Sequence, residues 1–256
     1  MPSNTPQLEG REEAVSPWRK PGFIAAGGFL AGVALLGVVV VATTGGTNTS
    51  TDPKAAPATT SSSAASASAS QPADGSCPAL TDTNTTVPST APAGVTWALF
   101  HGVALPASAA AGPGKTDGDV ARCYARTPAG ALLAATQIST RSMLAPDWRS
   151  VMTQQTYGDA RQAMIDARTK AEKAGPPPTP EPGELGQLAG FKFVTYGPST
   201  AVVEVVTRFS TGILQASALT VRWDAGRGDW QYEVSLSSAP QHSVPSLDGY
   251  VPWGGI

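Results

Sequence analysis

The chain has 256 residues, a net charge of −2 and only 14% charged residues. This balance provides neither a basic patch for nucleic acid nor an acidic run for a polycation, so we expect no direct contact with nucleic acid. Globular hydrophobic patterning begins only at about Gly94 and continues through a predicted domain at 93–256, a normal length for one domain with its own core.

The first part of the chain reads as a membrane anchor. A polar stretch, residues 1–20, precedes an apolar run at 21–43 that contains no charged residue. About 20 residues suffice to cross a hydrocarbon core of roughly 30 Å, so we predict a transmembrane helix there. Arg19 and Lys20 lie at its N-terminal edge and the next basic residue is Lys54, which predicts a cytoplasmic tail and an extracytoplasmic C-terminal domain in the cell membrane.

Two features of this run leave alternatives open. A signal peptide cleaved after Val40-Val41-Ala42 would also export the domain, although the apolar run exceeds the 7–15 residues of a signal core. Gly28 and Gly32 form a G-x-x-x-G spacing, which lets two membrane helices approach closely. That spacing fits a homo-oligomer through the span, but glycine is common in membrane helices generally.

A Ser/Thr/Ala/Pro tract follows at 44–92. Its first part, 44–76, has no aromatic residue and no Leu, Ile, Val or Met. Such a tract cannot bury enough apolar surface to offset its ordering entropy, so we predict a flexible linker with a reach on the order of 30 Å.

The two cysteines, Cys77 and Cys123, both follow the apolar run. In an exported domain such a pair predicts one disulfide, the alternative being two reduced thiols. The two histidines, His101 and His242, have no ligand spacing, so we expect no metal and no cofactor.

The predicted elements of the domain change character along the chain. A strand at 95–100 is followed by a helix that Thr127 caps and Pro128 opens, then by a short helix from Asp147 and a third at 159–174. The hydrophobic period then changes to two over four segments, 190–196, 201–209, 213–223 and 230–236, which predict an antiparallel meander. Helices followed by strands indicate an α+β fold with a curled antiparallel sheet closing over the first helix.

This order of elements resembles the NTF2-like (cystatin-like) fold. With the predicted anchor and linker it is similar to the inner-membrane scaffold subunit of type IV secretion and conjugation machines. Four segments also resemble exported proteins encoded on conjugative elements of high-GC Gram-positive bacteria: PAGALLAATQISTR (128–141), PDWRSV (146–151), GQLAGFKFV (186–194) and SLDGYVPWGG (246–255). The resemblance spans about residues 95–256 and brings no active-site residue with it.

Candidate functional residues are few. The sequence has no nucleophile motif, and Glu204 and His101 read as a solvated strand residue and a turn residue. The Arg-Gly-Asp tripeptide at 227–229 fits an ordinary hairpin tip, with adhesion as the alternative. Tyr250 and Trp253 lie in an aperiodic tail, which either docks across the domain or contacts a partner.

The leading functional hypothesis is a non-enzymatic, membrane-anchored scaffold or accessory subunit of a conjugation or type IV secretion-like apparatus, whose exported domain contacts other envelope proteins. One alternative is a small-molecule-binding or catalytic NTF2-like domain that uses a cavity between helix and sheet. Another is a cell-surface or wall-binding module.

Overall fold

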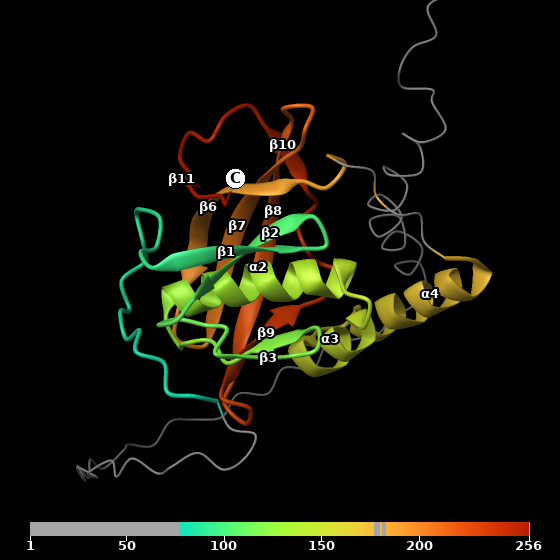
Figure 1. Cartoon of the computed structure of the whole chain (residues 1–256), viewed down its shortest axis with the longest axis horizontal. Helices are drawn as coiled ribbons and strands as arrows, with labels where there is room; N and C mark the ends of the chain where they lie inside the picture. Colours follow the sequence, from blue (N-terminus) through green and yellow to red (C-terminus); the bar gives the residue numbers. More distant parts are fainter. Residues whose placement is uncertain (1–76, 177–179, 181–182, 256) are drawn as a thin grey trace, which may run out of the picture. The chain divides into compact units, whose positions relative to one another are not determined.

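The computed structural model describes residues 77–176, 180 and 183–255. The predicted tail, the predicted span and the linker before Cys77 lie outside the described residues, so their structure is untested. Within the described part, no helix is long and apolar enough to cross a membrane. Its helices are α2 (Pro128–Leu144), α3 (Trp148–Gln155) and α4 (Arg161–Ala174) (Figure 1).

The main sheet of the described chain has seven strands. Six of them follow the order β11-β6-β7-β8-β9-β5, and the seventh, β10, pairs with the other end of the β8 edge that β9 occupies. Neighbouring strands are antiparallel, except that β5 runs parallel to β9. The strands are β5 (Thr156–Tyr157), β6 (Gln187–Tyr196), β7 (Thr200–Arg208), β8 (Leu214–Asp224), β9 (Asp229–Glu233), β10 (His242–Val244) and β11 (Val251–Pro252).

Two hairpins precede the first helix. One joins β1 (Val95–Phe100) to β2 (Val103–Ser108), and the other joins β3 (Lys115–Asp117) to β4 (Val120–Arg122). The turn of the first hairpin is His101-Gly102, with φ of 46° and 88°. Such a pair of positive φ angles matches the twist of a two-residue hairpin, which confirms the predicted strand at 95–100 and the turn position of His101.

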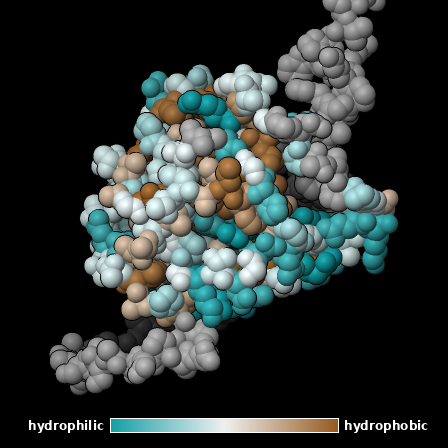
Figure 2. Space-filling view, viewed as in Figure 1, coloured by the Kyte–Doolittle hydropathy of each residue, from teal (hydrophilic) through white to brown (hydrophobic). Residues whose placement is uncertain are grey.

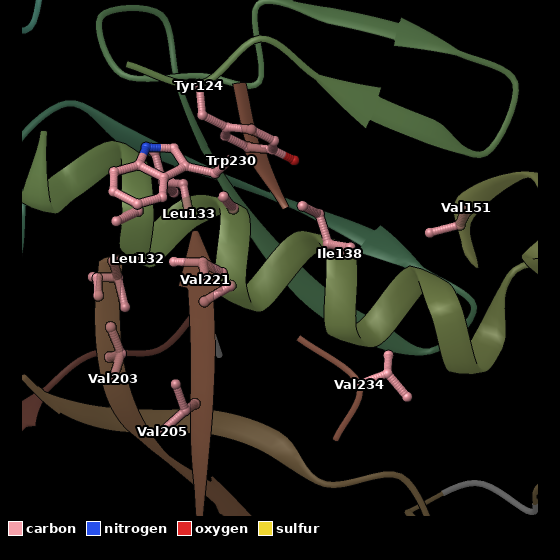
Figure 3. Close-up of a cluster of buried hydrophobic side chains, with 14 of the residues drawn as sticks. Tyr124, Leu132, Leu133, Ile138, Val151, Val203, Val205, Val221, Trp230 and Val234 are labelled. Carbon is pink, nitrogen blue, oxygen red and sulfur yellow. The ribbon is translucent and has the colours of Figure 1, made fainter. Parts of the chain in front are cut away.

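Helix α2 occupies the centre of the domain. It contacts α3, the strands β2 and β4 of the two hairpins, and β7, β8 and β9 of the sheet (Figure 1). Leu132, Leu133 and Ile138 are almost completely inaccessible, and they lie among side chains from the sheet such as Val221 and Trp230 (Figure 3). A helix covered on all sides needs apolar residues around most of its circumference, which α2 has.

The first turn of α2 is determined by its own residues. The Thr127 hydroxyl accepts a hydrogen bond from the Gly130 N–H at 3.2 Å, with Pro128 at the first helical position, as predicted. Gly130 is required by packing, because a Cβ there would lie 2.0 Å from the Ala125 carbonyl oxygen.

The predicted fold class, three helices on a curled NTF2-like sheet, is wrong. The described domain is dominated by strands, and its main sheet is neither curled nor closed, since β11 and β5 form open edges. Most of the error arose between Val103 and Arg122, where three strands were missed, and the short strands β5, β10 and β11 were missed as well. Strand β2 is buried almost throughout and therefore lacks a period of two, while β3 and β4 have three residues each.

The four strands of the predicted meander are present as β6 to β9, but the last strand is shorter than the predicted segment 230–236. Strand β9 ends at Glu233. The next residue, Val234, still donates its N–H to the Tyr157 carbonyl oxygen of β5 at 2.7 Å, and its carbonyl oxygen accepts the Ala160 N–H at 3.1 Å. Leu236, the last residue of the strand predicted at 230–236, lies beyond β9 and is 54% exposed.

We expect Gly130→Ala to destabilise the domain by about 3 kcal/mol, because the added methyl group meets backbone that cannot move without displacing the start of α2. Denaturant unfolding of the described domain measures this. Gly197→Ala is the matched control, since a Cβ there meets only an ordinary contact of 3.8 Å. Equal losses in the two variants would contradict the packing argument.

The predicted disulfide is present between Cys77 and Cys123, which are 46 residues apart. Closing a loop of this length removes conformational entropy from the unfolded chain, so we expect Cys77→Ala/Cys123→Ala to cost about 4 kcal/mol of unfolding free energy. Denaturant titrations with and without reductant test this. Reductant should destabilise the wild type and leave the double variant unchanged.

Candidate functional site

The outer face of the main sheet, opposite α2, carries a group of interacting polar side chains that joins the C-terminal segment to the sheet. Residues 242–255, here called the strap, pair with β8 through β10 and with β6 through β11. Between these two attachments the strap packs against a small apolar cluster that is separate from the main core: Val206, Leu214 and Ala216. The strap therefore joins two strands of the same sheet that are not neighbours.

Glu204 lies at the centre of this polar group. Its Oε2 atom accepts a hydrogen bond from the Tyr250 hydroxyl at 2.8 Å and forms an ion pair with Lys192 Nζ at 2.6 Å. Its Oε1 atom lies 3.6 Å from Nε2 of His242. Lys192 Nζ also lies 4.6 Å from the centre of the Tyr250 ring. Two side chains of the strap and one of β6 thus meet one carboxylate of β7.

The surroundings of Glu204, Lys192 and Tyr250 move the pKa values of these three groups further from neutrality. Desolvation raises the Glu204 pKa, but the hydrogen bonds from Lys192 and Tyr250 outweigh it, so the net pKa is lowered. The hydrogen bond to Glu204 raises the pKa of Lys192. Burial, followed by the neighbouring Glu204 carboxylate, raises the pKa of Tyr250.

These pKa shifts favour a structural role for the cluster of Glu204, Lys192, Tyr250 and His242, here called the latch. A general acid or base works best with a pKa near the operating pH, whereas Glu204 is held as an anion, Lys192 as a cation and Tyr250 as a neutral phenol. The cluster is suited to holding the strap against the sheet. The sequence reading of Glu204 as a solvated residue is wrong, since its side chain is only 12% exposed.

The tail residues both contact their own domain. Trp253 is 5% exposed, and its ring lies 5.0 Å from that of Trp97 and 5.4 Å from that of Phe191. Tyr250 is partly buried and bound to Glu204. These contacts correspond to the docked alternative for the tail, and a partner contact through either residue stays a prediction.

The other candidates are placed as follows. Gly28, Gly32, Arg19 and Lys20 lie outside the described residues. Asp147 caps α3 by accepting the Ser150 N–H at 3.2 Å, an ordinary structural role.

The Arg-Gly-Asp tripeptide cannot present its carboxylate from this conformation. Asp229 is 9% exposed and accepts backbone N–H groups from Cys123 at 2.7 Å, Tyr124 at 3.0 Å and its neighbour Trp230 at 2.9 Å. Burial raises the pKa of Asp229 despite these bonds. Asp229 therefore joins the start of β9 to the segment before α2.

Two hollows of the described domain lie away from the interface between α2 and the sheet. One, of about 220 Å³, borders the disulfide. The other, of about 350 Å³, is lined by Asp117, Asp119 and Asp147 together with Ser150. The described residues contain no group of three or more His, Cys, Asp or Glu side chains arranged to hold a metal.

Together these features define a strand-dominated domain built around one buried helix, with a C-terminal strap across the outer face of its sheet. The chain belongs to the family described as Domain of unknown function (DUF8175), whose model matches residues 57–252. No curated protein matches the chain, and no solved structure does.

The latch makes stability depend on pH in one direction. Because the Glu204 pKa is lower in the folded than in the unfolded state, its stabilising contribution is complete above the unfolded value of about 4.5 and is lost as pH falls through the lower folded value. We expect Glu204→Gln to remove this part of the acid dependence, measured as unfolding free energy between neutral and acidic pH.

Tyr250→Phe removes one hydrogen bond to the carboxylate and should cost about 1–2 kcal/mol at neutral pH. Asp248→Asn, at an exposed position of the strap, is the matched control and should leave stability nearly unchanged. An unaltered acid dependence in Glu204→Gln would show that the latch contributes nothing.

Proposed function

We propose that this protein is a non-enzymatic, membrane-anchored accessory subunit of a conjugation or type IV secretion-like apparatus, whose exported domain contacts other envelope proteins. The cytoplasmic tail, the span at 21–43 and the linker place the domain outside the membrane. Localisation and partners are parts of this proposal.

The observation that carries the proposal is the disulfide at the start of the described domain. Disulfides persist in oxidising compartments and are rare in the cytosol, so the Cys77–Cys123 bond is consistent with export by the apolar run at 21–43. Both cysteines follow that run, as the proposed orientation requires.

The outer-face cluster supports a role in contacts rather than in catalysis. Its charged groups serve to attach the strap, and their pKa values are displaced from the range useful for proton transfer near neutral pH. The segments that resemble proteins of conjugative elements form α2, the start of α3, β6 and the strap, which are elements that build the domain.

Deletion of the gene in a host that carries the transfer element tests this function. We expect DNA transfer to fall sharply and the full-length protein to restore it, whereas a variant whose residues 1–43 are replaced by a cleavable signal peptide fails because its domain is exported but no longer held at the membrane. Photo-crosslinking from exposed positions of the domain in living cells should capture other envelope proteins.

Two controls make the result specific. The variant without the span must retain the disulfide and a cooperative unfolding transition, so that lost transfer is not lost folding. A Gly197→Ala full-length protein should restore transfer completely. Normal transfer in the deletion strain would overturn the proposal.

A further inference from the structure

Strand β1 has a free edge without the features that usually prevent pairing with another strand. It pairs on one side with β2, and within the described residues no strand lies on its other side. Its sequence, VTWALF, contains no charge and no proline, and its register with β2 runs without a bulge. Leu99 is 74% exposed, and hydrophobic residues gather over the β1–β2 hairpin (Figure 2).

The other edge strands of the described sheets are shorter or contain a proline: β3 and β4 have three residues each, and β2, the partner of β1, has six residues but includes Pro106. Strands β11 and β5 have two residues each, and β11 includes Pro252. Proteins normally protect an exposed edge with charges, prolines, bulges or a short length, because free peptide groups pair readily with another strand. Six regular residues without any of these devices therefore indicate an edge that another strand covers.

The hairpin geometry determines which peptide groups are available. In a hairpin with a two-residue turn, the residues that flank the turn form a hydrogen-bonded pair, here Phe100 and Val103. Hydrogen-bonded pairs then recur at every second residue, so the peptide groups of Thr96, Ala98 and Phe100 point toward β2. Those of Val95, Trp97 and Leu99 point away from it.

We propose that β1 pairs in antiparallel fashion with β1 of a second copy of this chain. The outward groups of Trp97 then bond those of Leu99 in the second copy, and the reverse, around a twofold axis at Ala98. This register sets the exposed Leu99 side chain beside the Trp97 ring of the second copy. The two hairpins become a four-stranded ribbon, with β2 at each outer edge.

A second copy is the occupant that the composition favours. Self-pairing of VTWALF brings no like charges together, whereas a charged partner segment would find no opposite charge on this strand. A six-residue contact is small for a stable interface, so a local excess of the partner is needed. The inference rests on the proposed function in this respect, because anchoring through the predicted linker at 44–92 confines two copies to one surface.

Cysteine substitution in the full-length protein in its native membrane tests the pairing. The two natural cysteines are bonded to each other, so an introduced cysteine is the free thiol of the described domain. Position 98 would form a non-hydrogen-bonded pair with Cα atoms about 4.5 Å apart, which is within disulfide range. Ala98→Cys should give a reducible dimer on mild oxidation.

Thr96→Cys is the matched control, since it is also exposed but would lie about 13 Å from its counterpart. A second pair of variants separates hydrogen bonding from side-chain character in the Ala98→Cys background. Leu99→Pro deletes an outward N–H and leaves the bonds to β2 intact, so it should abolish the dimer. Leu99→Thr keeps the N–H and should retain the dimer.

Each outcome has a defined meaning. Equal crosslinking at 96 and 98, an equal effect of the two Leu99 variants, or capture of a different protein at 98 would overturn self-pairing. Membrane flotation, measured in the same samples, separates the two levels of inference. Protein in the membrane fraction without a dimer refutes the pairing alone, whereas protein absent from that fraction refutes the anchor and the pairing that depends on it.

Discussion

The burial of α2 on every side is the constraint on which the rest of the domain depends. A helix in this position must be apolar around most of its circumference, and its neighbours must cover it from several directions. The sheet covers one side, and α3 with the hairpin strands β2 and β4 covers the others. The approach of Ala125 to the first turn is so close that only glycine fits at position 130.

Polar side chains then join these surroundings to one another. The Asp229 carboxylate binds the backbone at Cys123 and Tyr124, and the Trp230 indole N–H donates to the Ala125 carbonyl oxygen at 2.9 Å. Gln187 contributes in the same way, because its amide bridges Gly102 and Ala104 of the first hairpin to β6. The central helix is therefore enclosed by elements that are hydrogen-bonded across long sequence separations.

The strap and its latch lie on the outer face of the main sheet, which α2 does not cover. Only one face of the sheet packs on the helix, and the strap shields part of the other with Tyr250 and Leu247. Its last anchor, Trp253, enters the main core beside Phe191 and Trp97. Within the described residues, no strand covers the free edge of β1, and this is the edge for which we propose pairing with a second chain.

Much of the element order was predictable, for reasons visible in particular residues. Thr127 and Pro128 start α2, Asp147 caps α3, and the alternation around Val203 and Val205 indicates β7. Strand β2 escaped prediction because burial on both faces removes the alternation that identifies a strand. The role of Glu204 escaped for another reason: its partners come from residues 192, 242 and 250, and local patterning cannot report contacts between distant segments.

The sequence by itself determined the apolar run at 21–43 and the local starts of α2 and α3, because each depends on composition or on neighbouring residues. With two cysteines in the chain it also left one possible internal disulfide, and the fold brings the two residues together to form it. Tertiary structure alone decided that the first helix lies inside the domain, that the sheet stays open and that the strap is latched by Glu204. These properties depend on which surfaces meet. All apolar faces of the chain compete for burial, and this competition decides which of them pack together. The sequence of a single segment therefore cannot predict its packing partners.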